Sequence, residues 1–201
     1  MACAARSVLL VEDDLALCGY LAAALRDAGF AVLLAHDRVQ ALTRLVDGQT
    51  VLLDLGLPPQ PNAMTEGLAL LDDGLRQAPD SKFIVLTGQD EDAAALEAVR
   101  RGAFDFLIKP ATLDAIFSAL HRAQWFVREE ALLTQSGETR LQLTTRLDEG
   151  PREAACHAEE QLLRRVLAST SYNVTESARR LGISREHVYY YLKKYGIRRP
   201  A

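Results

Sequence analysis

The fold class is indicated most clearly by residues 51–58, Val51-Leu52-Leu53-Asp54-Leu55-Gly56-Leu57-Pro58. An apolar, strand-like run ends at the carboxylate of Asp54, and a glycine and a proline follow closely. In an open parallel α/β sheet, the carboxyl ends of the strands converge on one edge, where ligands bind. Asp54 is therefore expected at the ligand-binding edge of such a sheet.

Three further motifs stand just past apolar runs of the same kind. They are the acidic run Glu12-Asp13-Asp14, Thr87 in Leu86-Thr87-Gly88, and Lys109 in Ile108-Lys109-Pro110. Each motif alone has an ordinary explanation, as a solvated turn, a helix cap or a surface charge. Their combination in this order, each at a strand end, predicts one shared site.

The residue types at this edge suit a magnesium ion and a phosphoryl group. Magnesium prefers six oxygen ligands and keeps several of its waters. Asp13 and Asp54 can supply carboxylates, Gly56 a backbone carbonyl and Glu12 a contact through water. A carboxylate can also form an acyl phosphate, and this chemistry predicts that Asp54 is the nucleophile.

Two more side chains would hold the phosphoryl group once it is bound. Lys109 would pair with one phosphoryl oxygen as a point charge, and the Thr87 hydroxyl would donate to another. Lys109 and the metal ion would also allow the crowded carboxylates to ionise together.

Apolar strands and amphipathic helices alternate over the first 125 or so residues, the pattern of a parallel sheet. The expected strands are 7–11, 31–35, 51–53, 82–86 and 104–108, and the expected helices are 15–28, 38–47, 67–77, 90–101 and 112–128. A polar stretch follows, and it predicts a linker over 129–152 with a short helical piece around 141–147. The fold class is thus α/β for residues 1–128, followed by a small all-α domain over 153–201.

The composition is that of a globular protein, with no apolar run approaching the ~20 residues of a membrane span. Three scattered cysteines lack ligand spacing, so a reduced cytoplasmic setting is expected. Residues 1–150 carry 13 Lys and Arg against 22 Asp and Glu, whereas residues 151–201 carry 10 against 5. A basic tail on an acidic body indicates that the tail meets nucleic acid.

The tail has the pattern of a helix-turn-helix. Two short helices, 175–181 and 185–195, are joined by a tight turn at Gly182. Thr175 and Ser184 are the expected N-caps of these helices.

Residues 6–124 resemble the receiver domain of two-component response regulators. The motifs Val-Glu-Asp-Asp, Leu-Leu-Asp-Leu-Gly-Leu-Pro, Leu-Thr-Gly and Ile-Lys-Pro stand in the family's order. The resemblance implies a flavodoxin-like (βα)5 fold with strand order 2-1-3-4-5 and phosphorylation of Asp54 by a sensor histidine kinase. It also implies that Phe106 is a switch aromatic that packs inward as Thr87 moves. The loop 58–67 is longer than is usual in the family, and its role stays open.

Residues 153–199 resemble the Fis-type helix-turn-helix that ends many bacterial regulators. The resemblance rests on Asn173-Val174-Thr175-Glu176, Ala178-Arg179-Arg180-Leu181-Gly182-Ile183-Ser184 and the helix after them. It implies a homodimer on double-stranded DNA, with Arg185 near the bases and the lysines on phosphates. The expected DNA-binding residues are Thr175, Ser184, Arg185, His187, Tyr190, Tyr191, Lys193 and Lys194. For Tyr190 and Tyr191, packing against the tail helix expected over residues 153–168 or against a dimer partner is an equal alternative.

The two parts are usually separated by an ATPase module, but this chain contains no Gly-Lys dipeptide and hence no Walker A loop. Their direct fusion resembles the regulators of the RegA/PrrA/ActR group. The expected function is that of a phosphorylation-switched transcriptional regulator rather than an enzyme. Two alternatives stay open. One is an architectural DNA-binding protein whose receiver only dimerises, and the other is a magnesium-dependent aspartyl-phosphate phosphatase. The phosphatase is disfavoured by Gly56, which stands where such enzymes need an acid.

Overall fold

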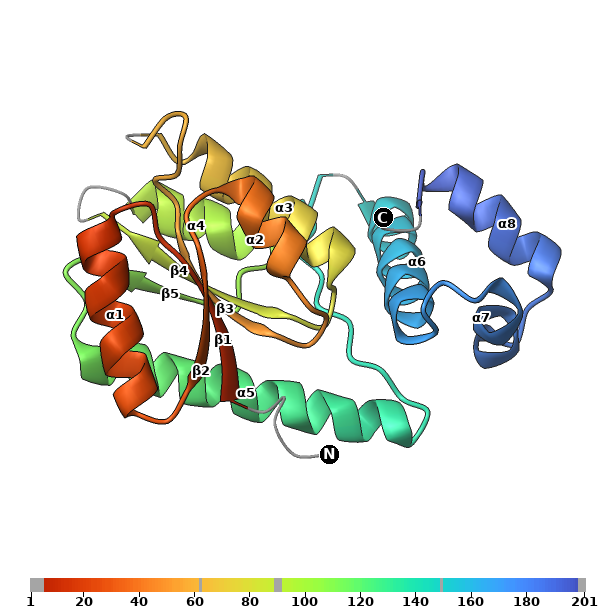
Figure 1. Ribbon diagram of the computed structural model, residues 1–201. Helices are drawn as coiled ribbons and strands as arrows, with labels where there is room; N and C mark the ends of the chain where they lie inside the picture. Colours follow the sequence, from red (N-terminus) through yellow and green to blue (C-terminus); the bar gives the residue numbers. More distant parts are fainter. Residues whose placement is uncertain (1–5, 62, 89–91, 149, 199–201) are drawn as a thin grey trace.

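The computed structural model describes residues 6–61, 63–88, 92–148 and 150–198. A parallel sheet with helices on both faces is followed by a linker and a group of helices that forms a second domain (Figure 1). No helix within the described ranges is long and apolar enough to cross a membrane.

The five strands are parallel and stand in the order β2-β1-β3-β4-β5, which confirms the order implied by the resemblance. They are β1 (Ser7–Val11), β2 (Ala31–Ala35), β3 (Thr50–Asp54), β4 (Lys82–Thr87) and β5 (Asp105–Ile108). In the register of β3 and β4, Asp54 lies opposite Leu86. The polar residues that follow the apolar runs therefore gather at one edge of the sheet.

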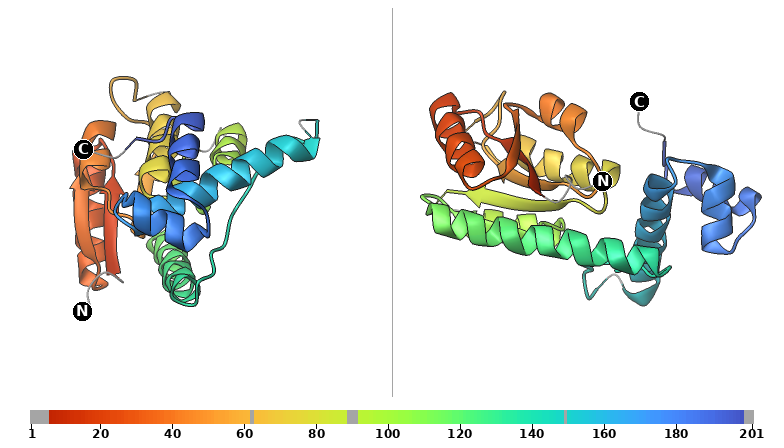
Figure 2. Two further views of the ribbon diagram at one scale, coloured as in Figure 1. Left: turned by 90° about the vertical axis from the view of Figure 1, so that its right-hand side faces the viewer. Right: turned by 60° about the horizontal axis from the view of Figure 1, so that its bottom comes forward.

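Helices cover both faces of the sheet (Figure 2). Helices α1 (Leu15–Asp27) and α5 (Leu113–Gln135) pack on one face, and α2 (Arg38–Arg44), α3 (Thr65–Gln77) and α4 (Asp92–Arg100) pack on the other. Side chains alternate along each strand, so Leu52 and Ile84 enter one core while Leu53 and Val85 enter the other. Each fully buried aliphatic side chain contributes about 2 kcal/mol relative to exposure.

Helix α5 is longer than the sequence pattern predicted. It was expected to end at residue 128, but it continues to Gln135 and carries Glu130 in a buried position. Glu, Ala and Leu between 129 and 133 are strong helix formers, which accounts for the extra turns. The expected start of the fourth helix, Asp90, lies outside the described residues.

The helical piece expected around 141–147 is absent, because residues 139–146 have no regular structure. An isolated helix of this length is marginal without an apolar face to bury, and Leu147 is 99% exposed. Regular helix does enter both ends of the stretch 129–152, through α5 and through α6 (Gly150–Ser169).

The second domain consists of α6, α7 (Val174–Leu181) and α8 (Arg185–Lys194). Its core is formed by Leu163, Leu167, Ala178, Val188 and Ile197. The turn between α7 and α8 uses Gly182 at φ +65°, a backbone conformation that favours glycine. The Ser184 cap is confirmed, because its side chain accepts from the amide of His187.

The predicted cap Thr175 is wrong. Helix α7 begins at Val174, and the side chain of Asn173 accepts from the amide of Glu176. Asn and Thr are both good N-cap residues, and the asparagine lies two positions earlier. Thr175 is instead an exposed residue in the first turn of α7.

Candidate functional site

The predicted acidic residues come together at the carboxyl edge of the sheet. Asp54 ends β3, and Glu12 and Asp13 directly follow β1. Carboxylate oxygens of these three residues lie within 4.8 Å of one another. Glu12 is anchored by its backbone, since its amide donates to the carbonyl of Ala35 over 3.1 Å.

Lys109 reaches into this acidic cluster from the loop after β5. Its Nζ lies 3.0 Å from Asp54 Oδ1 and 3.1 Å from Glu12 Oε2. Burial by itself lowers the pKa of the Lys109 ammonium, but the Asp54 and Glu12 carboxylates outweigh that effect and raise it. Lys109 is therefore charged when it meets a ligand at this edge.

Burial also raises the pKa of Glu12, and the charge of Asp54 raises it further. Three carboxyl groups face a single ammonium here, so the fully ionised cluster carries an excess of negative charge. A divalent cation with oxygen ligands would neutralise that excess. The donor set thus fits Mg²⁺, with Asp13 and Asp54 as carboxylate ligands.

Thr87 is the neighbouring hydroxyl, at the end of β4. Its carbonyl accepts from the Lys109 amide over 2.6 Å, so the two residues are joined through the backbone. Its side chain is buried, and among the described residues none offers a hydrogen-bond partner to Oγ1. A buried hydroxyl without a partner is costly, and a phosphoryl oxygen would satisfy it.

Phe106 is placed differently from the position that the resemblance implied. Its side chain is 38% exposed on β5, so in this structure it does not pack inward behind Thr87. In the strand register it lies opposite Val85 rather than Thr87. The inward packing of Phe106 remains a prediction for a phosphorylated form.

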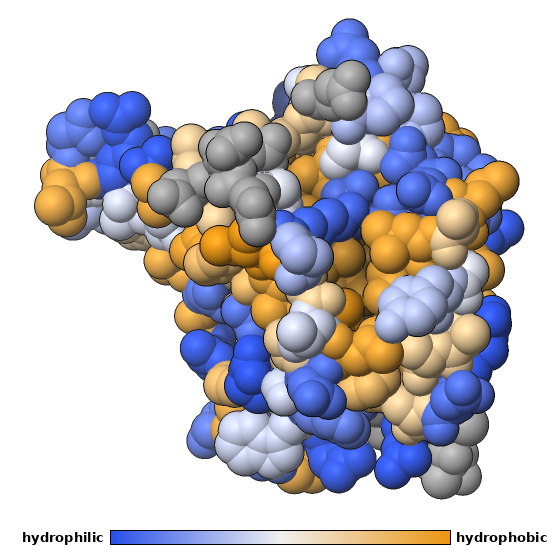
Figure 3. Space-filling view, turned by 90° about the vertical axis from the view of Figure 1, so that its left-hand side faces the viewer, coloured by the Kyte–Doolittle hydropathy of each residue, from blue (hydrophilic) through white to orange (hydrophobic). Residues whose placement is uncertain are grey.

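The extended loop 58–67 folds back onto the segment that follows Asp54. A Cβ on Gly56 would lie 2.4 Å from the carbonyl oxygen of Pro61, and one on Gly67 would lie 2.4 Å from Leu55 Cα. Both glycines therefore permit a close approach of backbone to backbone beside the site. Figure 3 shows this side of the molecule, where hydrophobic surface borders a group of hydrophilic residues.

In the second domain, helix α8 presents several of the predicted DNA-binding residues to solvent. Arg185, His187, Tyr190 and Lys193 are exposed along it, and Ser184 is exposed at its cap. An exposed helix with a basic residue in its first turn can enter a major groove.

Two of the predicted contacts are engaged within the domain. Tyr191 is half-buried in the domain core and stacks on Tyr195 with ring centroids 6.3 Å apart. Lys194 Nζ lies 2.6 Å from Glu159 Oε2 of α6, and this carboxylate raises the pKa of Lys194. For Tyr191 the structure favours the packing alternative.

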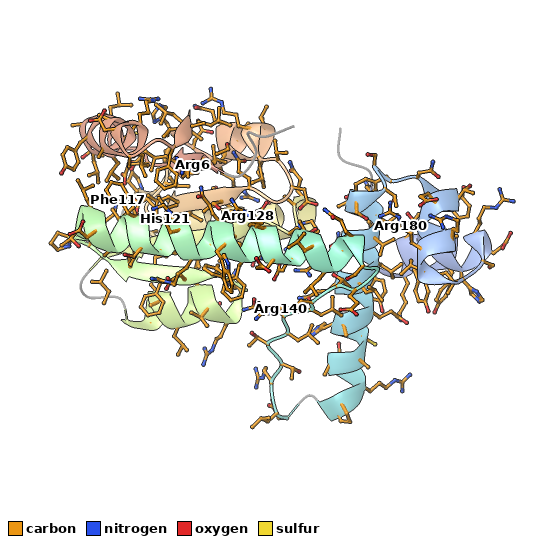
Figure 4. The ribbon with its side chains drawn as sticks, turned by 90° about the horizontal axis from the view of Figure 1, so that it is seen from below. Arg6, Phe117, His121, Arg128, Arg140 and Arg180 are labelled. Carbon is orange, nitrogen blue, oxygen red and sulfur yellow. The ribbon has the colours of Figure 1, made fainter. Side chains whose placement is uncertain are left out.

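Arg179 and Arg180, which were not among the predicted DNA-binding residues, are exposed in the last turn of α7 (Figure 4 labels Arg180). Glu176 holds both, with Arg179 bound through Nε at 2.9 Å and a terminal nitrogen at 2.6 Å. The adjacent pair of arginines in an otherwise amphipathic helix is a signal that could have marked them as candidates for phosphate contact.

Comparison with known families decides the identity. The family model described as the response regulator receiver domain matches residues 8–121, and the model of the bacterial regulatory protein Fis family matches residues 157–195. The chain is a DNA-binding two-component response regulator. The first match lies within the α/β part of the fold, and the second lies within the group formed by α6, α7 and α8.

A relative of similar length is the acid tolerance regulatory protein ActR of Rhizobium meliloti. The two sequences are 30% identical, and the match covers 90% of the present chain and 82% of ActR. The nitrogen assimilation regulatory protein NtrX of Azorhizobium caulinodans is also 30% identical, but the match covers 59% of this chain and only 26% of NtrX.

Among solved structures, a response regulator from Burkholderia pseudomallei matches with a TM-score of 0.52 and 28% identity. The match covers 92% of this chain and 96% of that one. The Burkholderia protein was crystallised with a phosphorylated aspartic acid, a calcium ion and citrate. NtrX from Brucella abortus matches with a TM-score of 0.58 and 27% identity, over 80% of this chain and 34% of NtrX.

Proposed function

We propose that this regulator accepts a phosphoryl group on Asp54 from a sensor histidine kinase and thereby changes its binding to promoter DNA. One observation carries the proposal: Lys109 Nζ lies 3.0 Å from Asp54 within a cluster of carboxylates at the carboxyl edge of the sheet. This arrangement joins a nucleophile, a metal-binding donor set and a cation for the product. The phosphorylated aspartic acid of the Burkholderia regulator is consistent with it.

In the transfer, an Asp54 carboxylate oxygen attacks the phosphorus of a phosphohistidine. The bond from phosphorus to the histidine nitrogen breaks, its electron pair leaves with the imidazole ring, and an acyl phosphate forms. When bound, Mg²⁺ would neutralise charge on the phosphoryl oxygens, held by Asp13, Asp54, the Gly56 carbonyl and a water on Glu12.

The chain's own residues then hold the product. Lys109 keeps its contact with the modified Asp54 through a phosphoryl oxygen, and the Thr87 hydroxyl donates to another. Movement of Thr87 toward the phosphoryl group leaves a space that Phe106 would enter from its exposed position. The phosphoryl group thereby favours one conformation of the β4–β5 edge over the other.

The output is a change in DNA binding by two copies of the Fis-family domain, in the cytoplasm where DNA and kinase are both accessible. Arg185 opens α8 after the Ser184 cap and would read a guanine, with His187 and Tyr190 beside it. Lys193 and Thr175, both exposed, would contact phosphates, while Lys194 must first leave Glu159.

Intact mass after treatment with acetyl phosphate and magnesium tests the proposal. The wild type should gain the mass of one phosphoryl group, and Asp54→Asn should gain none. Asp13→Asn should label more slowly at limiting magnesium, because it loses a metal ligand. Asp105→Asn is a matched control, since Asp105 starts β5 at the other edge of the sheet and should label normally.

The outcomes separate the alternatives. Labelling of Asp54→Asn at the wild-type rate would show that the acceptor is misassigned. Unlabelled wild type whose DNA binding is also unchanged would support the architectural alternative.

A further inference from the structure

A second cluster of charged residues lies at the opposite edge of the receiver sheet, where the strands begin. Lys82 is the first residue of β4, and its Nζ lies 2.5 Å from Glu130 Oε2 on α5. The two side chains are only 9% and 11% exposed. Burial of an ion pair is expensive unless further groups satisfy both partners, and Glu130 makes further contacts.

Those contacts come from outside the receiver. Arg165 of α6 is 12% exposed, and its guanidinium lies 3.9 Å from Glu130 Oε2 and 3.2 Å from Asp80 Oδ1. It also donates to the carbonyl of Pro79 over 3.5 Å. One arginine of the DNA-binding domain thus contacts both α5 and the turn before β4.

The linker joins the same cluster. Arg140 lies 3.5 Å from Glu130 Oε1, and its guanidinium stands 5.3 Å from the ring centre of Phe126 on α5. Its carbonyl accepts from Arg165, and Thr139 Oγ1 lies 3.2 Å from the same guanidinium. Figure 4 shows Arg140 where the end of α5 approaches α6. We call Asp80, Lys82, Glu130, Arg140 and Arg165 the basal cluster.

The contact around the basal cluster mixes polar and apolar side chains and leaves an unfilled space. A cavity of about 280 Å³ lies between the domains, with Leu75 and Phe104 of the receiver on one side and His157 and Gln161 of α6 on the other. Incompletely filled contacts between domains, with charged and apolar side chains mixed, resemble transient protein interfaces and permit the domains to move apart. This contact therefore has the character of one that opens and closes.

Two elements connect the basal cluster to the phosphorylation edge. Strand β4 begins at Lys82 and ends at Thr87, so it spans both clusters over about 17 Å. Helix α5 begins shortly after Lys109 and carries Glu130 near its far end. A shift of Thr87 or Lys109 therefore acts on elements that hold the basal cluster.

We propose that the basal edge of the receiver is a docking surface for α6 of the same chain, closed by Arg165, and that phosphorylation releases it. The docked domain has a fixed position on its own receiver. A released domain can adjust to a second copy on paired half-sites, which lie about one DNA turn apart. The release step rests on the proposed function, whereas the docking itself does not.

Docking is tested on the unphosphorylated full-length chain with Arg165→Gln. Small-angle scattering should give a larger radius of gyration than wild type. Protease cleavage between residues 136 and 148 should be at least about fivefold faster, because cleavage follows the population of the open form. Arg152→Gln is the matched control, an exposed arginine in the first turn of α6 that should behave as wild type. Asp80→Asn, which removes a partner on the receiver side, should open the chain in the same direction.

Scattering and cleavage rates equal to wild type in folded Arg165→Gln and Asp80→Asn would overturn the docking. The release step is tested by treating the wild type with acetyl phosphate and recording mass and scattering on one sample. A gain of one phosphoryl group together with the Arg165→Gln scattering curve is expected. A gain of mass with unchanged scattering would overturn the release and leave the proposed function standing. Absence of any mass gain would count against the proposed function, and Arg165→Gln would still decide the docking.

Discussion

Each end of the receiver sheet pairs a lysine with carboxylate, but one site is suited to chemistry and the other to contact between the domains. At the carboxyl edge, Lys109 is 29% exposed and faces Glu12 and Asp54. At the basal edge, Lys82 is 9% exposed and its partner Glu130 is also met by Arg140 and Arg165. The first cluster has an excess of carboxylates and an unpartnered hydroxyl among the described residues, whereas the chain itself completes the second.

The difference shows how similar charged residues form a ligand-binding site at one end of the sheet and a contact between domains at the other. An accessible cluster with uncompensated negative charge can bind a cation and a phosphoryl group. In the basal cluster each carboxylate is paired with at least one cation, so the cluster holds elements together, and the contact is lost when one partner is removed. Strand β4 has Lys82 of the basal cluster at its start and Thr87 of the phosphorylation site at its end, so the same sheet holds both sites.

The largest expected effect contrasts the stability of the two clusters. Glu130→Gln leaves Lys82 buried without a counter-charge and should lower the free energy of unfolding by about 3 kcal/mol. Asp54→Asn relieves repulsion among carboxylates and should leave the receiver as stable as wild type or more so. Urea unfolding of both variants checks this contrast. An equal loss in the free energy of unfolding in the two variants would show that both clusters contribute to stability in the same way.

The next effect concerns the coupling between the edges. Thr87→Ala should still accept the phosphoryl group, because Asp54, Lys109 and the metal-binding residues remain. The DNA affinity of Thr87→Ala should no longer change on phosphorylation, which removes a coupling of about 1–3 kcal/mol between phosphorylation and DNA binding. The DNA affinity of Lys109→Ala should also change little on phosphorylation. Mass spectrometry and DNA titration on the same samples measure both properties, and a wild-type response in Thr87→Ala would break the link through β4.

An effect of comparable size is expected on base preference when Arg185 is changed, because Arg185 lies at the start of α8, away from the basal cluster. Arg185→Ala should relax sequence preference, most strongly at one base pair in each half-site, by about 1–3 kcal/mol. It should leave the scattering curve of the unbound protein unchanged. Titration against a panel of single-base variants of the site is the appropriate measurement. An unchanged preference would remove Arg185 from the base-reading role.

The smallest expected effect is on the salt dependence of DNA binding, and it contrasts two lysines of α8, one without and one with an ion-pair partner among the described residues of the domain. Lys193 is exposed, whereas Lys194 is bound to Glu159. Lys193→Ala should lower the slope of affinity against salt by about one unit, and Lys194→Ala should lower it less. DNA titrations at several salt concentrations provide the slopes. A larger change for Lys194→Ala would mean that the lysine leaves Glu159 on DNA.

Much of the phosphorylation edge was predictable because its residues follow strands directly. Apolar runs locate Asp54, Thr87 and Lys109, and parallel strands bring their ends together whatever the lengths of the helices between them. The outward position of Phe106 was not predictable, since a strand residue can face either side and the sequence pattern does not report the state of a switch.

The basal cluster could not be predicted for a physical reason. Lys82, Glu130 and Arg165 are far apart in the sequence, and each alone has the pattern of an ordinary surface charge. Their meeting depends on the extra turns of α5 and on the path of the linker, neither of which follows from hydrophobic periodicity. Asn173 in place of Thr175 at the α7 cap is a smaller case, in which two suitable residues compete.

The chemical state of Asp54 is proposed to set the affinity of the whole chain for DNA. The decisive measurement is a titration of wild type and Asp54→Asn on a site recovered by genome-wide footprinting, each with and without acetyl phosphate and magnesium. Wild-type affinity should change by about 5–150-fold, and the affinity of Asp54→Asn should stay constant. An equal change in both proteins, or no change in a wild type shown by mass to be phosphorylated, would contradict the account.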